Sequence, residues 1–303
     1  MRRGGRTTLV VMIAGLVLCT LTRVYTIAAG TDMTMGFFYH DSELLCNILY
    51  YGLLTAVAVA AMAAAHKDAK GAFGRVEATD IVDARAAVIG FGLLVLAMYA
   101  GYEGMKETKT LSPSSKLIIA DFIFAAAGAV LAFVILYKKE FKPVMGFIMA
   151  FGGLYYTMRG INCFNKRMVI TSIPEYLIQA MSAVGAAVTF ILLAKFLSGN
   201  AGKLTKTALC GWGAATVVLN LSSAGATALA DVTALGEVSA RIVPSANEAA
   251  MYFQMSAGDE PYKMAFTPLL DVLTGLFIGA VLIVILFARH TERAAKETIN
   301  EGA

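Results

Sequence analysis

Charged and strongly polar side chains lie inside apolar stretches of this sequence, where few such residues are expected, and five of them could take part in binding. They are Arg23, Asp121, Arg159, Asn220 and Asp271. Ionisable residues within membrane helices are rare, and they commonly bind a solute, an ion or a proton, or pair with one another. The arginines suit an anionic group, the aspartates a cation or a proton, and the amide either. We take these five as candidate substrate-binding residues.

Each candidate also has a purely structural explanation. Arg23 and Arg159 can extend their long side chains to the membrane surface, or they can pair with an acid of a neighbouring helix. Asp121 and Asp271 can be solvated in the first turns of their helices, where the helix dipole also stabilises a carboxylate. Asn220 can hydrogen-bond to another helix.

The depth of the candidates within their apolar stretches is similar. Arg6 to Arg23 and Lys142 to Arg159 both span about 17 residues, or roughly 25 Å at 1.5 Å per helical residue. In the other stretches, the number of residues between the basic residue at the cytoplasmic end and the polar residue is similar. We therefore predict that these polar residues form one layer near the outer edge of the membrane. Its expected members are Arg23, Asn47, Glu103, Asp121, Arg159, Gln179, Asn220 and Asp271.

The composition of the chain indicates a membrane protein. Apolar residues make up 58% and charged residues 15%, whereas soluble domains average about 45–50% and about 25%. Because ~20 apolar residues cross a bilayer as a helix, we predict an all-α, polytopic membrane bundle of about eight transmembrane helices in four hairpins. The expected spans are 8–28, 43–65, 86–104, 116–137, 143–163, 175–196, 206–228 and 265–288.

The order of the polar residues repeats along the chain. Arginine, amide, acid or amide, and aspartate follow one another twice, which suggests two parallel four-helix halves of the kind found in some transporters. The first half would be 1–142. The second would be 143–303, with an outer loop at 229–264 and a cytoplasmic tail at 289–303.

The basic residues predict the orientation. With eight spans, both termini lie on the same side of the membrane, and about two thirds of the 25 Lys and Arg residues fall on that side. The positive-inside rule places this side in the cytoplasm. We therefore expect a multi-pass protein of the cell membrane, in contact with the lipid bilayer, with both termini cytoplasmic. A net charge of +4 gives no reason to expect nucleic-acid binding.

Aromatic residues and cysteines add little to the functional prediction. Tyr50, Tyr155 and Tyr156 are expected near one membrane surface, as part of an aromatic belt. The cysteines Cys19, Cys46, Cys163 and Cys210 lack metal-ligand spacing. Cys46 and Cys163 are predicted at the same face, where they either pair or stay as buried thiols.

No sequence motif indicates catalysis, nucleotide binding, a metal or another cofactor. A membrane-embedded enzyme would need a catalytic pair of residues, and the sequence does not point to one. The sequence instead favours a small-solute or ion permease, or the membrane subunit of a transporter. The alternative is a non-transporting membrane scaffold, sensor or accessory subunit. Either role allows a membrane or cytoplasmic protein partner.

Overall fold

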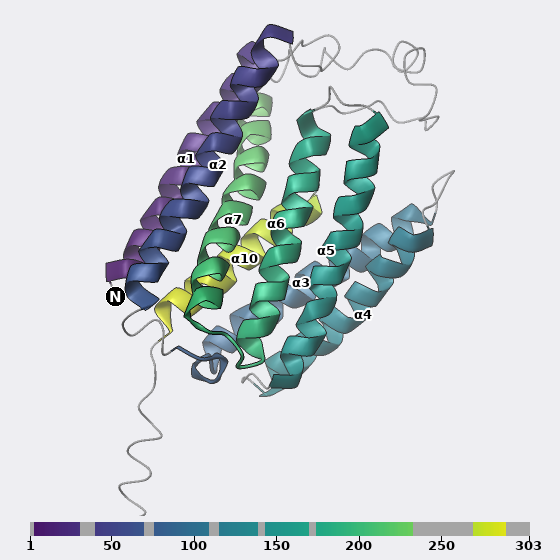
Figure 1. The fold of residues 1–303 in the computed structure, drawn as a ribbon. Coiled ribbons are helices and arrows are strands. Elements are labelled where there is room, and N and C mark those ends of the chain that lie inside the picture. The colour runs from purple at the N-terminus through teal and green to yellow at the C-terminus, as the bar shows by residue number, and fades with distance from the viewer. Residues whose placement is uncertain are drawn as a thin grey trace, which may run out of the picture.

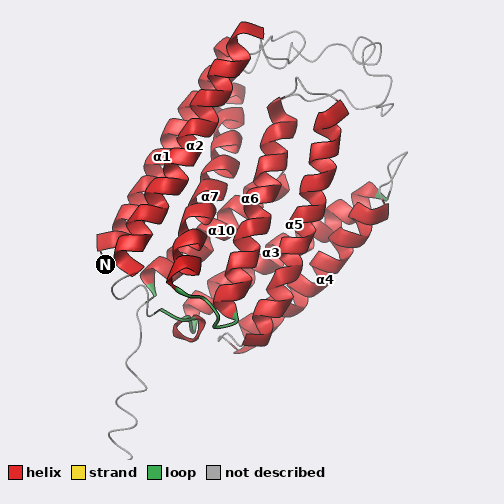
Figure 2. Cartoon of the chain, viewed as in Figure 1, coloured by secondary structure: helices red, strands yellow, loops and turns green. Residues whose placement is uncertain are grey.

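The computed structural model describes residues 3–30, 40–69, 76–108, 115–138, 143–169, 174–232 and 269–288. Eight long helices make up nearly all of this part of the chain (Figures 1 and 2). They are α1 (Arg3–Gly30), α2 (His40–Ala69), α3 (Ala84–Glu107), α4 (Ser115–Lys138), α5 (Pro143–Val169), α6 (Pro174–Leu197), α7 (Lys203–Val232) and α10 (Leu269–Phe287).

The predicted all-α membrane bundle is confirmed. Seven of the eight long helices among the described residues are apolar enough, as well as long enough, to cross a membrane. Helix is the expected form because hydrocarbon cannot hydrogen-bond to an open backbone. The eighth, α5, is long enough but more polar, since Tyr155, Tyr156, Thr157 and Arg159 interrupt its apolar sequence.

The four predicted hairpins are also confirmed. Consecutive helices pack as the pairs α1–α2, α3–α4, α5–α6 and α7–α10. Six helices close a ring, in which α3, α4, α5, α6, α7 and α10 each pack on the next and α10 returns to α3. The hairpin α1–α2 packs on the outside of this ring against α7, which thus touches four other helices. Division into two halves at residue 142 stays a prediction.

Both ends of the described chain lie at the same end of the bundle (Figure 1). A Cβ atom added to Gly5, near the start of α1, would stand 3.3 Å from the carbonyl oxygen of Leu286 at the end of α10. This arrangement requires an even number of membrane crossings, in keeping with eight. Of the predicted outer loop at 229–264, only the start is described, as the last turn of α7. The predicted tail at 289–303 lies outside the described residues.

Aromatic side chains fill the space inside the ring. Phe124 of α4 stacks on Tyr155 of α5 with ring centroids 4.5 Å apart, and Tyr156 stacks on Phe190 of α6 at 5.2 Å. Phe190 in turn stacks on Phe277 of α10 at 5.7 Å. The expectation of a membrane-surface belt is therefore wrong for Tyr155 and Tyr156, which are buried in the core because neighbouring helices cover them.

The described part of the connection between α2 and α3, residues 76–83, is packed against the bundle. Val76 and Ile81 are fully buried, on either side of a single turn of 3-10 helix, η2 (Ala78–Asp80). The backbone N–H of Glu77 donates to Oδ2 of Asp80 at 2.9 Å, which closes the turn. Glu77 and Asp80 both attract the amino group of Lys206, a buried residue in the first turn of α7.

Close contact between α6 and α7 depends on Gly185. A Cβ atom there would stand 2.6 Å from Oγ1 of Thr216, and that hydroxyl is held in place because it donates to the carbonyl oxygen of Trp212 at 2.8 Å. Gly52 of α2 is a matched control, since a Cβ atom added there meets nothing within 4 Å.

We therefore expect Gly185→Ala to lower the free energy of unfolding by about 1–3 kcal/mol through overpacking. Gly52→Ala should raise it by about 0.5–1 kcal/mol, because alanine favours a helix. Thermal or denaturant unfolding of the purified protein in detergent measures both. Equal stability of the two variants would contradict the packing of α6 on α7 described here.

Candidate functional site

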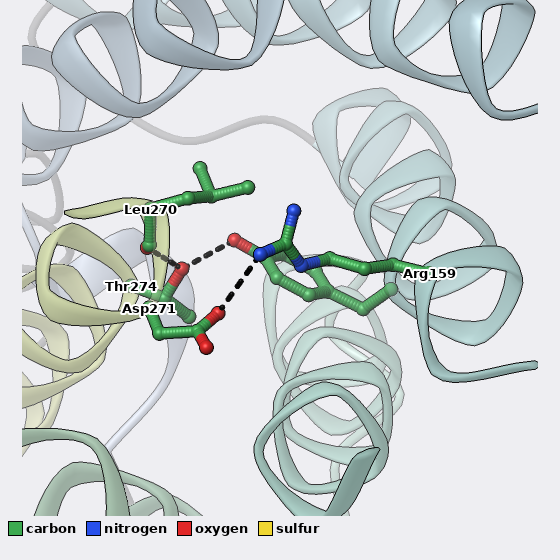
Figure 3. Close-up of polar contacts among 5 residues, drawn as sticks. Arg159, Leu270, Asp271 and Thr274 are labelled. Carbon is green, nitrogen blue, oxygen red and sulfur yellow. Dashed lines mark hydrogen bonds and ion pairs between the residues drawn. The ribbon is translucent and has the colours of Figure 1, made fainter. Parts of the chain in front are cut away.

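An ion pair connects two helices across the ring. Nη2 of Arg159 on α5 lies 3.5 Å from Oδ1 of Asp271 on α10, and the two side chains are 14% and 4% exposed (Figure 3). Asp271 lies in the first turn of α10, where the helix dipole favours a negative charge. Of the structural alternatives for Arg159, pairing with an acid is the one observed, and extension to the membrane surface is not.

A chain of hydroxyl groups holds the first turn of α10 beside this ion pair. The hydroxyl of Thr274 donates to the carbonyl oxygen of Leu270 at 2.6 Å (Figure 3). The hydroxyl of Tyr156 forms a short hydrogen bond to Oγ1 of Thr274 and, since the Thr274 proton is already used, Tyr156 is the donor. We call Tyr156, Arg159, Asp271 and Thr274 the α5–α10 cluster.

Two further carboxylates belong to the same electrostatic environment. Asp121 of α4 is 2% exposed and interacts with the hydroxyl groups of Tyr155 and Tyr156. It fits beside α3 because a glycine, Gly104, faces it: a Cβ atom there would stand 2.9 Å from the Cβ atom of Asp121. Glu103, the neighbour of Gly104, interacts electrostatically with Asp271.

Asn220 of α7 is buried with no hydrogen-bond partner for either atom of its amide within the described part of the chain. It packs against Gly275, where an added Cβ atom would stand 2.9 Å from the Cβ atom of Asn220. Gly275 follows Thr274 directly and Asp271 by one helical turn, so Asn220 lies next to the α5–α10 cluster. The expected hydrogen bond to another helix is not formed. A buried polar group in this state costs about 1–3 kcal/mol.

Arg23 belongs to a second group of polar residues. It is 4% exposed and interacts electrostatically with Tyr50 of α2. The Tyr50 hydroxyl lies 2.9 Å from the hydroxyl of Ser222 on α7 and is buried, contrary to the belt prediction. We call Arg23, Tyr50 and Ser222 the α1–α2–α7 cluster.

The structure thus brings the five predicted residues into two groups. Arg159 and Asp271 are in contact, with Asn220 one turn away along α10 and Asp121 linked through the tyrosines. Arg23 belongs to the other group, and α7 contributes a residue to each region, because it carries Ser222 and Asn220 two positions apart. Sequence reasoning missed Tyr156 and Thr274, because a tyrosine assigned to an aromatic belt and a threonine in a helix each have common structural roles.

The cysteines and acids provide no further site among the residues that the structure describes. All four cysteines are buried free thiols, so Cys46 and Cys163 do not form a disulfide. Within the described ranges, no three His, Cys, Asp or Glu side chains are arranged to hold a metal ion.

Comparison with known proteins gives no guide to this site, since the chain matches no protein-family model, no curated protein and no solved structure.

The ion pair predicts strongly non-additive mutations. Arg159→Met or Asp271→Leu alone leaves a buried charge without its partner and should lower the free energy of unfolding by about 3–5 kcal/mol. The double variant removes both charges, so its loss should be smaller than the sum of the two single losses by about 2 kcal/mol or more.

Denaturant unfolding of the two single variants and the double variant measures this coupling. Arg159→Met combined with Thr55→Val, at an exposed position of α2, is the control and should be additive. Additive losses for Arg159 and Asp271 as well would show that the pair contributes nothing in the folded protein.

Proposed function

We propose that this chain is a permease for a small polar solute or an ion, or the membrane subunit of such a transporter. Its substrate would be bound in the polar layer that holds Arg23, Asp121, Arg159, Asn220 and Asp271. The observation that carries the proposal is the amide of Asn220, which is 1% exposed and has no partner among the described residues. Polar residues that serve packing alone normally satisfy one another. A bound solute would supply the missing hydrogen bonds.

The position of the polar clusters between the proposed halves supports this function. In the α5–α10 cluster, Arg159 and Asp271 come from the proposed second half, while Glu103 and Asp121 beside them come from the first. Transporters with repeated halves bind substrate at the interface between them and move one half against the other. A division at residue 142 would place the site at such an interface.

For localisation, we propose the cell membrane with both termini in the cytoplasm. The concentration of Lys and Arg at the shared end of the bundle supports this orientation. The common end for α1 and α10 is in keeping with it.

A non-transporting scaffold or accessory subunit is the second candidate. The observation that favours it is the closed set of contacts around α10: Arg159 pairs with Asp271, Tyr156 bonds to Thr274, and stacked aromatic rings fill the ring of helices. In this role the polar groups would fix the positions of the helices, and a membrane or cytoplasmic protein would bind elsewhere on the chain.

Asn220→Leu distinguishes the two functions, because leucine keeps the volume of the side chain but removes the amide. If Asn220 binds substrate, this variant should be as stable as the wild type or more stable by about 1–3 kcal/mol, yet lose most of its transport. Uptake of a panel of ions and small polar solutes into proteoliposomes measures transport. Asp271→Asn and Arg159→Ala should also reduce it.

Thr8→Val is the matched control, since the Thr8 hydroxyl is also buried without a partner among the described residues. Thr8 lies near the start of α1, whereas the candidate Arg23 lies near the end of that helix. Thr8→Val should leave uptake unchanged. Undiminished uptake by Asn220→Leu, Asp271→Asn and Arg159→Ala would rule out the site. A wild-type protein that moves no member of the panel would rule out transport and favour the scaffold.

A further inference from the structure

We propose that the α5–α10 cluster, with Asn220, binds a small organic cation of the ammonium or guanidinium type. This inference rests on the permease function proposed above and names its class of substrate. It follows from the charges around the site, the unused hydrogen-bonding capacity of Asn220 and the aromatic residues close by.

The charges favour a cation. Among the described residues, two carboxylates, those of Glu103 and Asp271, lie in the electrostatic environment of the Arg159 guanidinium. Glu103 and Asp271 repel each other, and within the described ranges the ion pair of Arg159 is with Asp271. Excess negative charge at this depth is costly because hydrocarbon screens it poorly. A solute with one positive charge would offset it, whereas an anion would increase it.

The nearby lysines do not supply this positive charge from within the bundle. Lys106 follows Glu103 by one turn at the end of α3, and Lys116 lies in the first turn of α4. Both side chains are exposed, in contrast to the buried carboxylates of Asp121 and Asp271.

The hydrogen-bonding groups suit an N–H donor. Ammonium and guanidinium groups only donate, so they need several acceptors. Oδ1 of Asn220 accepts no hydrogen bond from the described residues, and the carboxylate of Asp271 lies one helical turn away along α10. A hydroxyl on the solute, or a water molecule, would accept from Nδ2 of the same amide.

Aromatic residues favour an organic cation over a metal ion. Tyr99, Tyr155 and Tyr156 interact electrostatically with Arg159, so an organic cation bound beside Arg159 would lie near their hydroxyl groups, which can accept hydrogen bonds from its N–H groups. A divalent metal ion would need converging carboxylates, and no three acidic, histidine or cysteine side chains are so arranged in the described residues.

Three small, permanently charged probes test the proposal in proteoliposomes: guanidinium, the zwitterion glycine betaine and the anion methanesulfonate. The wild type should take up guanidinium at least about tenfold faster than either of the others, a factor that corresponds to about 1.4 kcal/mol. Glu103→Gln should reduce guanidinium uptake about fivefold or more, and Glu103→Asp, which keeps the charge, should retain most of it.

Asp83→Asn is the control, because it removes an acid immediately before the opposite end of α3 and suits the positive φ of 54° at that position. Its uptake of guanidinium should equal that of the wild type. The thermal unfolding midpoint of each variant shows that the protein is folded. Glu103 is only half-buried, so its removal should leave that midpoint nearly unchanged.

Preference for glycine betaine or methanesulfonate would overturn the cation proposal and leave the permease function in place. A loss in Asp83→Asn equal to that in Glu103→Gln would overturn the assignment to this site. Uptake of none of the three probes would overturn the cation proposal too. The broader panel would then decide separately whether the chain transports anything.

Discussion

A membrane interior stabilises neither a free backbone group nor a lone charge, and this constraint determines both the helices and the ion pair between Arg159 and Asp271. A charged residue at the centre of a membrane helix costs about 2.5–3.5 kcal/mol on insertion scales. The pair, 3.5 Å apart, offsets part of this cost for both residues. It joins α5, the most polar of the long helices described, to α10, whose sequence is almost wholly apolar beyond its first two turns.

The sequence was sufficient for those features that depend on one helix at a time. Composition and the length of the apolar stretches predicted the helices, and the succession of these stretches in pairs predicted the hairpins. Similar depth also predicted that Arg159 and Asp271 lie at one level of the membrane. What depth leaves open is the direction in which a side chain points, because an arginine that reaches the membrane surface and one that pairs inside the bundle have the same sequence context.

The rest of the site depends on how helices distant in sequence pack together. Asp121 is accommodated where Gly104 leaves room, and Asn220 where Gly275 does, but glycines are too frequent in this chain to identify those contacts beforehand. Tyr156 looks like a residue of the membrane surface until α4, α6 and α10 cover it. Helix α7 connects the two polar clusters through Ser222 and Asn220, so a rotation of α7 would disturb both at once.

The packed connection before α3 has a mechanical consequence. Val76 and Ile81 are buried in the core, and Asp80 closes the turn between them. Asp80 also attracts Lys206, so residues 76–83 link the first turn of α7 to the start of α3. A displacement of the first turn of α7 would therefore act on the residues that lead into α3, although α3 and α7 are not neighbours in the ring.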